Sequence, residues 1–126
     1  MGMTAISWTR AIVAVVVGYL IAALANSAWV MSWYVNAEPE VTAALVVMTV
    51  AMFALSGFVA GFVLGKIAGA PAGSAGLVTA ALLAVAGVAN LLLGMSFEPT
   101  WHVLAAIFVQ APAAAIGARL ASPGRD

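Results

Sequence analysis

The stretch GFVAGFVLGKIAGAPAG, residues 57–73, has a glycine at every fourth position. An α-helix turns by about 100° per residue, so each four-residue step drifts by only about 40° and the glycines form one slowly winding groove. Such a groove lets a second helix backbone approach closely, which favours helix association in lipid. The repeat therefore predicts a tightly packed helix of the glycine-zipper type. It does not say whether the partner helix belongs to the same chain.

Other apolar segments carry stripes of small residues at the same four-residue spacing, which could receive this groove. One stripe includes Ala14, Gly18 and Ala22, and another includes Ala113, Gly117 and Ala121. These faces suffice to close a bundle, so packing within one chain is our first interpretation and an oligomer interface is the alternative. The helix-packing residues predicted in this way are Gly18, Gly57, Gly61, Gly65, Gly69 and Gly117.

The composition places the whole chain in a membrane. Of its 126 residues, 66% are hydrophobic and 6% are charged, whereas a soluble domain has roughly 45–50% and about 25%. Four apolar segments approach the roughly 20 residues that span a bilayer. They cover residues 11–35, 41–67, 76–95 and 101–120. The sequence thus predicts a single all-α domain over residues 1–126, an integral membrane four-helix bundle.

Short separators rich in proline and glycine join these segments, so consecutive helices should be antiparallel hairpins. The two hairpins form a weak parallel repeat, because Glu38-Pro39 and Glu98-Pro99 each precede an even-numbered span. Four basic residues fall on one side of the membrane in this arrangement: Arg10, Lys66, Arg119 and Arg125. Basic residues near span ends stay in the cytoplasm, which predicts cytoplasmic termini in a bacterial cytoplasmic (inner) membrane.

The first segment has a second interpretation. Arg10, the apolar run from Ala11 and the small residues Ala23-Leu24-Ala25 are also typical of a cleavable signal peptide. Against cleavage, apolar character continues to Val35, well beyond the hydrophobic core of an ordinary signal peptide. Cleavage would leave three spans, and our prediction of four assumes that it does not occur.

Polar residues within the spans provide the candidate sites. Asn26, Asn90 and Gln110 carry carboxamides that must find partners in hydrocarbon, so we expect them to face the bundle interior. They can hold the helices together by hydrogen bonds, or they can line a polar pathway through the membrane. His102, four residues after Glu98, is a candidate proton or metal site at the outer surface, although two ligands are too few to predict a metal.

Several functional classes lack the residues that they need. The chain has no cysteine, one histidine and a net charge of zero, so the sequence predicts no metal site, no cofactor and no nucleic-acid partner. It contains neither a Ser-His-Asp set nor a phosphate-binding loop, and every carboxylate lies in a loop or at the terminus. We therefore expect no enzymatic activity. A lipid- or quinone-using subunit would have only Tyr19 and His102 to support it.

The layout is similar to that of small bacterial four-span proteins whose glycine-rich second helix ends in a basic residue. It lacks the first-helix glutamate of the small multidrug exporters and the asparagine signature of the fluoride channels. Two functional hypotheses follow. The first is a non-enzymatic accessory or assembly subunit that packs through its small-residue faces against lipid and a larger membrane-protein partner. The alternative is a small channel or carrier, a homo-oligomer, with a route lined by Asn26, Asn90 and Gln110.

Overall fold

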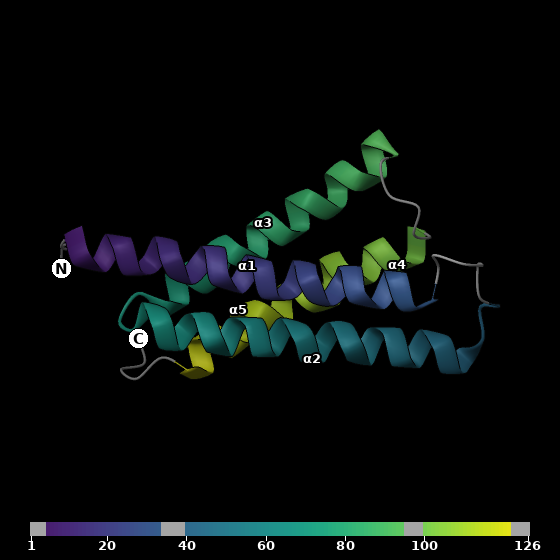
Figure 1. Ribbon diagram of the computed structural model, residues 1–126, viewed down its shortest axis with the longest axis horizontal. Helices are drawn as coiled ribbons and strands as arrows, with labels where there is room; N and C mark the ends of the chain where they lie inside the picture. Colours follow the sequence, from purple (N-terminus) through teal and green to yellow (C-terminus); the bar gives the residue numbers. More distant parts are fainter. Residues whose placement is uncertain (1–4, 34–39, 95–99, 122–126) are drawn as a thin grey trace.

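The computed structural model describes residues 5–33, 40–94 and 100–121, with side chains from residue 8 onwards. Within these ranges the fold is all-helical and has no strand (Figure 1). Its elements are α1 (Ala5–Trp33), α2 (Ala43–Ala68), α3 (Ala72–Leu93), α4 (Thr100–Ala105), the π-helical segment η1 (Ala106–Gln110) and α5 (Ala111–Ala121). The last three elements follow one another without a break and form the fourth rod. Four stretches are long and apolar enough to cross a membrane: Trp8–Trp33, Ala43–Ala68, Ala72–Leu93 and Thr100–Ala121.

The helices differ from the predicted segments mainly at their beginnings. Helix α1 begins at Ala5 rather than at residue 11, and α3 begins at Ala72 rather than at residue 76. The residues that we assigned to the second separator therefore form the first turn of α3. Pro71 precedes this turn, and a proline at a helix start has its backbone φ already near the helical value. Residues 34–35 and 95, where two predicted segments end, lie outside the described ranges.

Helix ends are fixed by local hydrogen bonds. The Thr42 side chain accepts a bond of 3.1 Å from the Leu45 N–H at the start of α2. At the other end, the N–H of Gly69 donates to the Gly65 carbonyl with φ at +73°, a conformation that favours glycine. Arg10 adds a bond of 3.0 Å from Nε to the Ile67 carbonyl. Gly69 thus ends α2 beside Arg10, whereas the sequence predicted a packing position.

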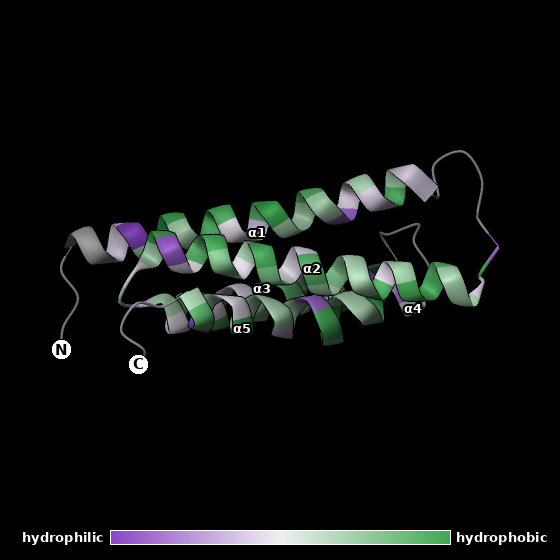
Figure 2. Cartoon of the chain, turned by 90° about the horizontal axis from the view of Figure 1, so that it is seen from below, coloured by the Kyte–Doolittle hydropathy of each residue, from purple (hydrophilic) through white to green (hydrophobic). Residues whose placement is uncertain are grey.

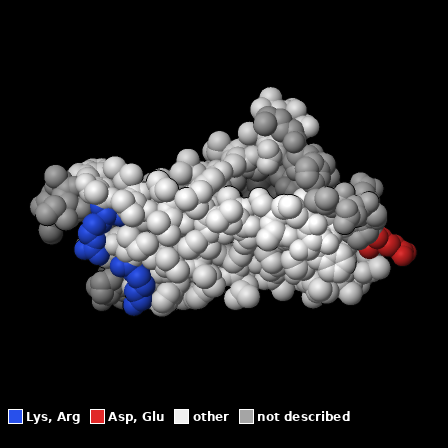
Figure 3. Space-filling model, in the orientation of Figure 1, with Lys and Arg blue, Asp and Glu red and all other residues white. Residues whose placement is uncertain are grey.

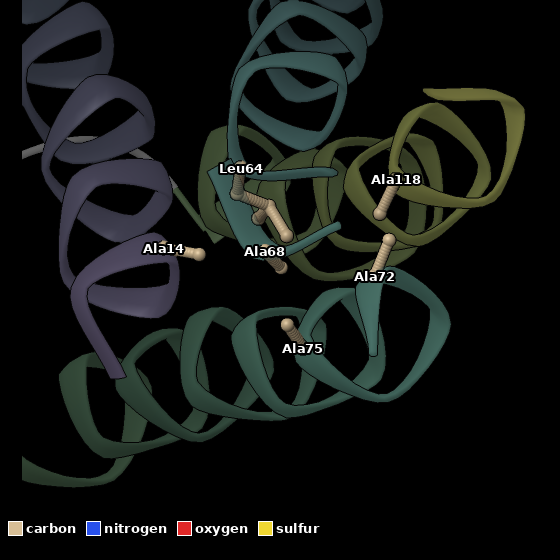
Figure 4. Close-up of a cluster of buried hydrophobic side chains, with 6 residues drawn as sticks. All are labelled: Ala14, Leu64, Ala68, Ala72, Ala75 and Ala118. Atoms are coloured by element: carbon tan, nitrogen blue, oxygen red, sulfur yellow. The ribbon is translucent and has the colours of Figure 1, made fainter. Parts of the chain in front are cut away.

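The core consists largely of alanine, which brings the helix axes close together. One cluster joins Ala14, Leu64, Ala68, Ala72, Ala75 and Ala118, contributed by all four rods (Figure 4). A second cluster joins Ala22, Ala60, Leu83, Ala111 and Ala114. Small side chains permit many backbone contacts per turn, and dispersion between packed atoms is the main attraction between helices in lipid.

The glycine repeat of α2 packs against α5, the most extensive helix pair in the structure. A Cβ atom built on Gly65 would lie 2.8 Å from the Ala118 carbonyl oxygen. Cβ atoms on Gly57 and Gly61 would collide with the carbonyl oxygens of Gln110 and Ala114. From the opposite side, Gly117 meets the backbone of Phe58 and Phe62, and Gly18 of α1 packs on the Leu64 side chain. These glycines therefore lie in contacts within the chain.

Hydrophobic residues predominate along the helices (Figure 2), and many of their large side chains are exposed. The charges of the described chain lie at its two ends (Figure 3). Arg10, Lys66 and Arg119 are exposed near the start of α1 and the ends of α2 and α5. Figure 3 shows basic side chains at this end and acidic atoms at the opposite one. We call these the basic end and the acidic end; Glu40 marks the latter. The separation matches the sequence pattern that predicted the membrane orientation.

Candidate functional site

A pair of carboxamides joins the first and fourth rods in the interior. Asn26 Nδ2 donates to Gln110 Oε1 at 3.0 Å, while Gln110 Nε2 donates back to Asn26 Oδ1 at 2.7 Å. Gln110 also donates to Ser56 Oγ on α2 at 3.0 Å. The Gln110 side chain is completely buried, and both of its N–H groups are used. Three helices are thus tied together at one point by neutral hydrogen bonds.

A second polar contact lies nearer the acidic end. Trp29 Nε1 donates to the buried Thr49 Oγ1 at 3.0 Å, which links α1 to α2. The Trp29 ring also lies 5.8 Å from that of Trp33. With α1 held to α2 at Trp29 and to Gln110 at Asn26, one face of α1 is fixed against the bundle. Asn26 also lines a cavity on the other side of this contact.

The π-helical segment η1 positions Gln110. The N–H of Ala111 bonds to the Ala106 carbonyl, five residues back, which widens the helix just before Pro112. Proline has no N–H, and its ring collides with the carbonyl four residues earlier in a regular α-helix, here that of Phe108. A π turn at this point relieves the collision and inserts one extra residue. The proline is visible in the sequence, whereas the π turn before it is seen only in the structure.

A cavity of about 460 Å³ opens between α1, α3 and the α4–η1 segment. Asn26, Asn90 and Gln110, the three predicted intramembrane residues, all line it, together with Tyr19 and Ser27. Its apolar wall is formed by Ala23, Val30, Met31, Leu83, Ala86, Gly87, Val103 and Ala106. Helix α3 packs on η1 at Gly87, where a Cβ atom would collide with Ile107. The C-terminal part of α3 diverges from the other helices (Figure 1), and residues of this part, such as Asn90, line the cavity.

The polar groups of the cavity differ in whether they are already paired. Within the described part of the chain, the side chains of Tyr19, Ser27 and Asn90 form no hydrogen bond, and Asn26 retains one unused N–H. Asn90 is only half-buried. Unpaired amide and hydroxyl groups are costly in hydrocarbon, so water or a ligand must satisfy them. The three predicted carboxamides therefore separate into a structural pair and one free group.

Among the described residues that line the cavity there is no Asp, Glu, Lys or Arg, so this part of the wall is electrically neutral. Among the described residues, no three His, Asp or Glu side chains come together as a metal ion would require. Asn, Ser and Tyr can both donate and accept hydrogen bonds. The described wall of the cavity is thus suited to holding an uncharged group that donates and accepts hydrogen bonds.

His102 packs inside the bundle. Its side chain has no exposed surface and packs in the interior, with its ring centroid 4.9 Å from that of Phe53 in an edge-on arrangement. The Trp101 ring lies 5.6 Å away on another side. The sequence marked this histidine as a candidate proton or metal site at the outer surface, and the turn of α4 directs its ring toward α2. Glu98, the other residue of that candidate pair, lies outside the described ranges.

Sequence reasoning did not select Ser56 as a site residue, although it accepts the third bond of Gln110. The two residues are 54 positions apart, and a single serine in an apolar helix does not by itself indicate its hydrogen-bond partner. Comparison of the chain with protein-family models, with curated proteins and with solved structures gives no match in any of the three. The geometry of the cavity is therefore the basis for assigning a function.

Proposed function

We propose that the protein binds a small uncharged molecule inside the membrane, as a carrier or receptor that does not transform its ligand. The observation that carries this proposal is the cavity of about 460 Å³, whose wall combines unpaired Tyr19, Ser27 and Asn90 side chains with apolar residues. Ligand pockets usually have volumes of roughly 300–1,000 Å³ and few polar groups on an apolar wall. Unpaired polar groups facing an open space in hydrocarbon also favour a functional role over simple packing.

A carrier or receptor fits this geometry better than an open channel. Leu83 lines the cavity and also belongs to the packed cluster that includes Ala22 and Ala111. Toward the basic end, the cluster around Leu64 continues this packing. A channel needs a polar path through both clusters, and the residues that form them are apolar. The ligand would therefore enter and leave on one side unless the helices move.

We propose ligand binding in preference to the accessory-subunit hypothesis. It relied on small-residue faces that could receive a partner protein, and Gly57, Gly61 and Gly65 already pack against α5 of the same chain. The exposed surface of the helices consists of larger apolar side chains, such as Leu92 and Phe108, which are 79% and 72% exposed. Lipid covers such a surface without any protein partner. A homo-oligomer remains compatible with ligand binding and is testable by native mass spectrometry.

We further propose that both termini lie in the cytoplasm, in the cytoplasmic membrane of a bacterium. Arg10, Lys66 and Arg119 at the basic end support this orientation under the positive-inside rule. The cavity, which lies toward the acidic end, would then be in the outer half of the membrane. Its ligand would come from the outer leaflet or from the medium outside.

Cysteine accessibility tests the proposal, since the chain has no cysteine of its own. Ala86→Cys places a thiol in the cavity wall, and Val85→Cys places one on the adjacent exposed face, where Val85 is 65% exposed. Only a hydrated thiol ionises readily and reacts with a charged maleimide. In nanodiscs we expect rapid labelling of the Ala86→Cys variant and slow labelling of the Val85→Cys variant. Equal, slow labelling would mean that the cavity is closed to water and would refute the proposal.

A second measurement addresses the ligand itself. Ala86→Phe fills the cavity, whereas Val85→Phe adds the same ring to the lipid-facing side of α3. Native mass spectrometry of the mildly solubilised protein should show a one-to-one small-molecule adduct in the Val85→Phe variant. The Ala86→Phe variant should lose it. An adduct that persists in both variants would be bound elsewhere.

A further inference from the structure

The cavity opens sideways. Figure 1 shows α3 diverging from α1 toward the acidic end, and Figure 3 shows a recess beneath the raised end of α3 from the same direction. The line of sight in both figures is perpendicular to the long axis of the molecule. If the helices span a bilayer along their length, the side of the molecule that is seen in this view is surrounded by lipid. The mouth between α1 and α3 therefore faces lipid, and a molecule dissolved in lipid can enter through it.

The cavity wall has a polar part and an apolar part. Asn26, Ser27 and Asn90 supply unused hydrogen-bonding groups, while Val30, Leu83 and Val103 supply buried apolar surface. Met31, 64% exposed, extends the apolar part to the mouth. A ligand that satisfies the whole wall needs a polar head with donors and acceptors and an apolar tail. A small polar solute would leave the apolar wall uncovered, and an alkane would leave the amides unpaired.

The absence of charge in the wall decides the kind of head group. A phosphate or carboxylate in this cavity would have no cation among the lining residues, and an uncompensated charge is strongly disfavoured in hydrocarbon. The exposed cations of the described chain, such as Lys66 and Arg119, lie at the basic end, away from the cavity. Ordinary anionic phospholipids are therefore poor ligands. Hydroxyl and amide groups match the donors and acceptors of Asn90 and Ser27.

We infer that the cavity binds an amphiphile with an uncharged, hydroxyl- or amide-bearing head group, which enters from the lipid between α1 and α3. The head group contacts Asn90, Ser27 and the unused N–H of Asn26, and the tail runs along Val30, Met31 and Leu83 toward the mouth. This inference rests on the proposed function and specifies its ligand class. The Asn26–Gln110 pair forms the floor of the site and stays intact when the ligand is bound.

The test uses the Ala86→Cys protein in phosphatidylglycerol nanodiscs. The bulk lipid is then a charged amphiphile, which we expect not to occupy the cavity. Three conditions are compared: no addition, a minor mole fraction of monoolein in the lipid, and glycerol in the buffer. Monoolein has an uncharged glycerol head and an apolar tail. We expect monoolein to slow maleimide labelling at position 86 saturably, and glycerol alone to have no effect. Val85→Cys controls for changes in the bilayer and should label at one slow rate throughout.

Variants locate the binding contact. In the Ala86→Cys background, Asn90→Leu should weaken protection by monoolein about three- to tenfold, the loss expected for one or two neutral hydrogen bonds. Ser32→Ala is the matched control, since the Ser32 hydroxyl donates to the Ala28 carbonyl on the exposed face of α1. It should leave protection unchanged. Equal protection in the Asn90→Leu and control variants would refute the assigned contact.

The outcomes distinguish the two proposals. Rapid labelling at position 86 with protection by glycerol would support a ligand-binding cavity but overturn the amphiphile, since the tail would not be needed. Rapid labelling that neither probe slows would likewise overturn the inferred ligand class while the cavity remains open. Slow labelling of the Ala86→Cys variant under every condition would refute the proposed function and the inference together. Saturable protection by monoolein alone supports both.

Discussion

Asn26 and Gln110, 84 residues apart in the chain, exchange two hydrogen bonds of 3.0 and 2.7 Å. Each amide thus donates to and accepts from the other, and Gln110 gains a third bond from its contact with Ser56. This pair divides the polar residues of the spans into those that hold the bundle together and those that remain available to a ligand.

The carboxamide pair should stabilise the fold, and Asn90 should not. We expect Asn26→Leu and Gln110→Leu to be coupled in a double-mutant cycle by about 1 kcal/mol, within the range seen for hydrogen bonds between membrane helices. The measurement is the free energy of unfolding in mixed detergent micelles. Asn90→Leu is the control, because its side chain forms no hydrogen bond within the described residues. A cost for Asn90→Leu equal to that for Gln110→Leu would contradict this division of roles.

Pro112 should maintain the π turn that positions Gln110. In Pro112→Ala the clash with the Phe108 carbonyl disappears, so the segment can become a regular α-helix. Loss of the extra residue would rotate Gln110 by about 100° relative to α5. We therefore expect the coupling between positions 26 and 110 to fall toward zero in the Pro112→Ala background. Unchanged coupling would indicate that packing around η1, and not the proline, holds the π turn.

The glycine repeat should tolerate no added carbon at Gly61. A Cβ atom there would collide with the Ala114 carbonyl oxygen, so Gly61→Ala must separate α2 from α5. Overpacking of this kind typically costs about 1–3 kcal/mol, although alanine is the better helix former by about 1 kcal/mol. The measurement is again unfolding in detergent. Val59→Leu, on the exposed side of the same helix, is the control and should change little. Equal stability of both variants would place the glycines outside a tight contact.

The orientation of the chain is testable with reporter fusions. Reporters after Glu40 and Glu98 should be active outside the cytoplasm, and reporters after Ala70 and Asp126 inside, because the basic residues are retained in the cytoplasm. Ala70 is the appropriate position because it precedes α3, which begins at Ala72. A cytoplasmic reporter after Glu98 would refute the orientation with four spans. It would also move the cavity to the inner half of the membrane.

Local features of the sequence determined the number and kind of helices. Apolar runs of spanning length, separated by segments with proline such as Ala70-Pro71, predict four rods, because hydrophobic length and breaker residues act within one segment. The four-residue glycine spacing likewise follows from helix geometry alone, so Gly57, Gly61 and Gly65 had to share one face. The sequence also indicated that Asn26, Asn90 and Gln110 belong in the interior, since exposure to lipid would leave their amides unpaired.

Only the tertiary structure decided which faces meet. The helices are apolar all round, so their pattern does not distinguish an inward from a lipid-facing side as it does in a soluble bundle. The pairing of Asn26 with Gln110, the choice of α5 as partner for the glycine repeat and the inward position of His102 all depend on residues distant in sequence. The cavity arises in the same way, because α3 packs on η1 at Gly87 while its C-terminal part diverges from the other helices (Figure 1). No local pattern encodes that divergence, because it results from packing among several helices at once.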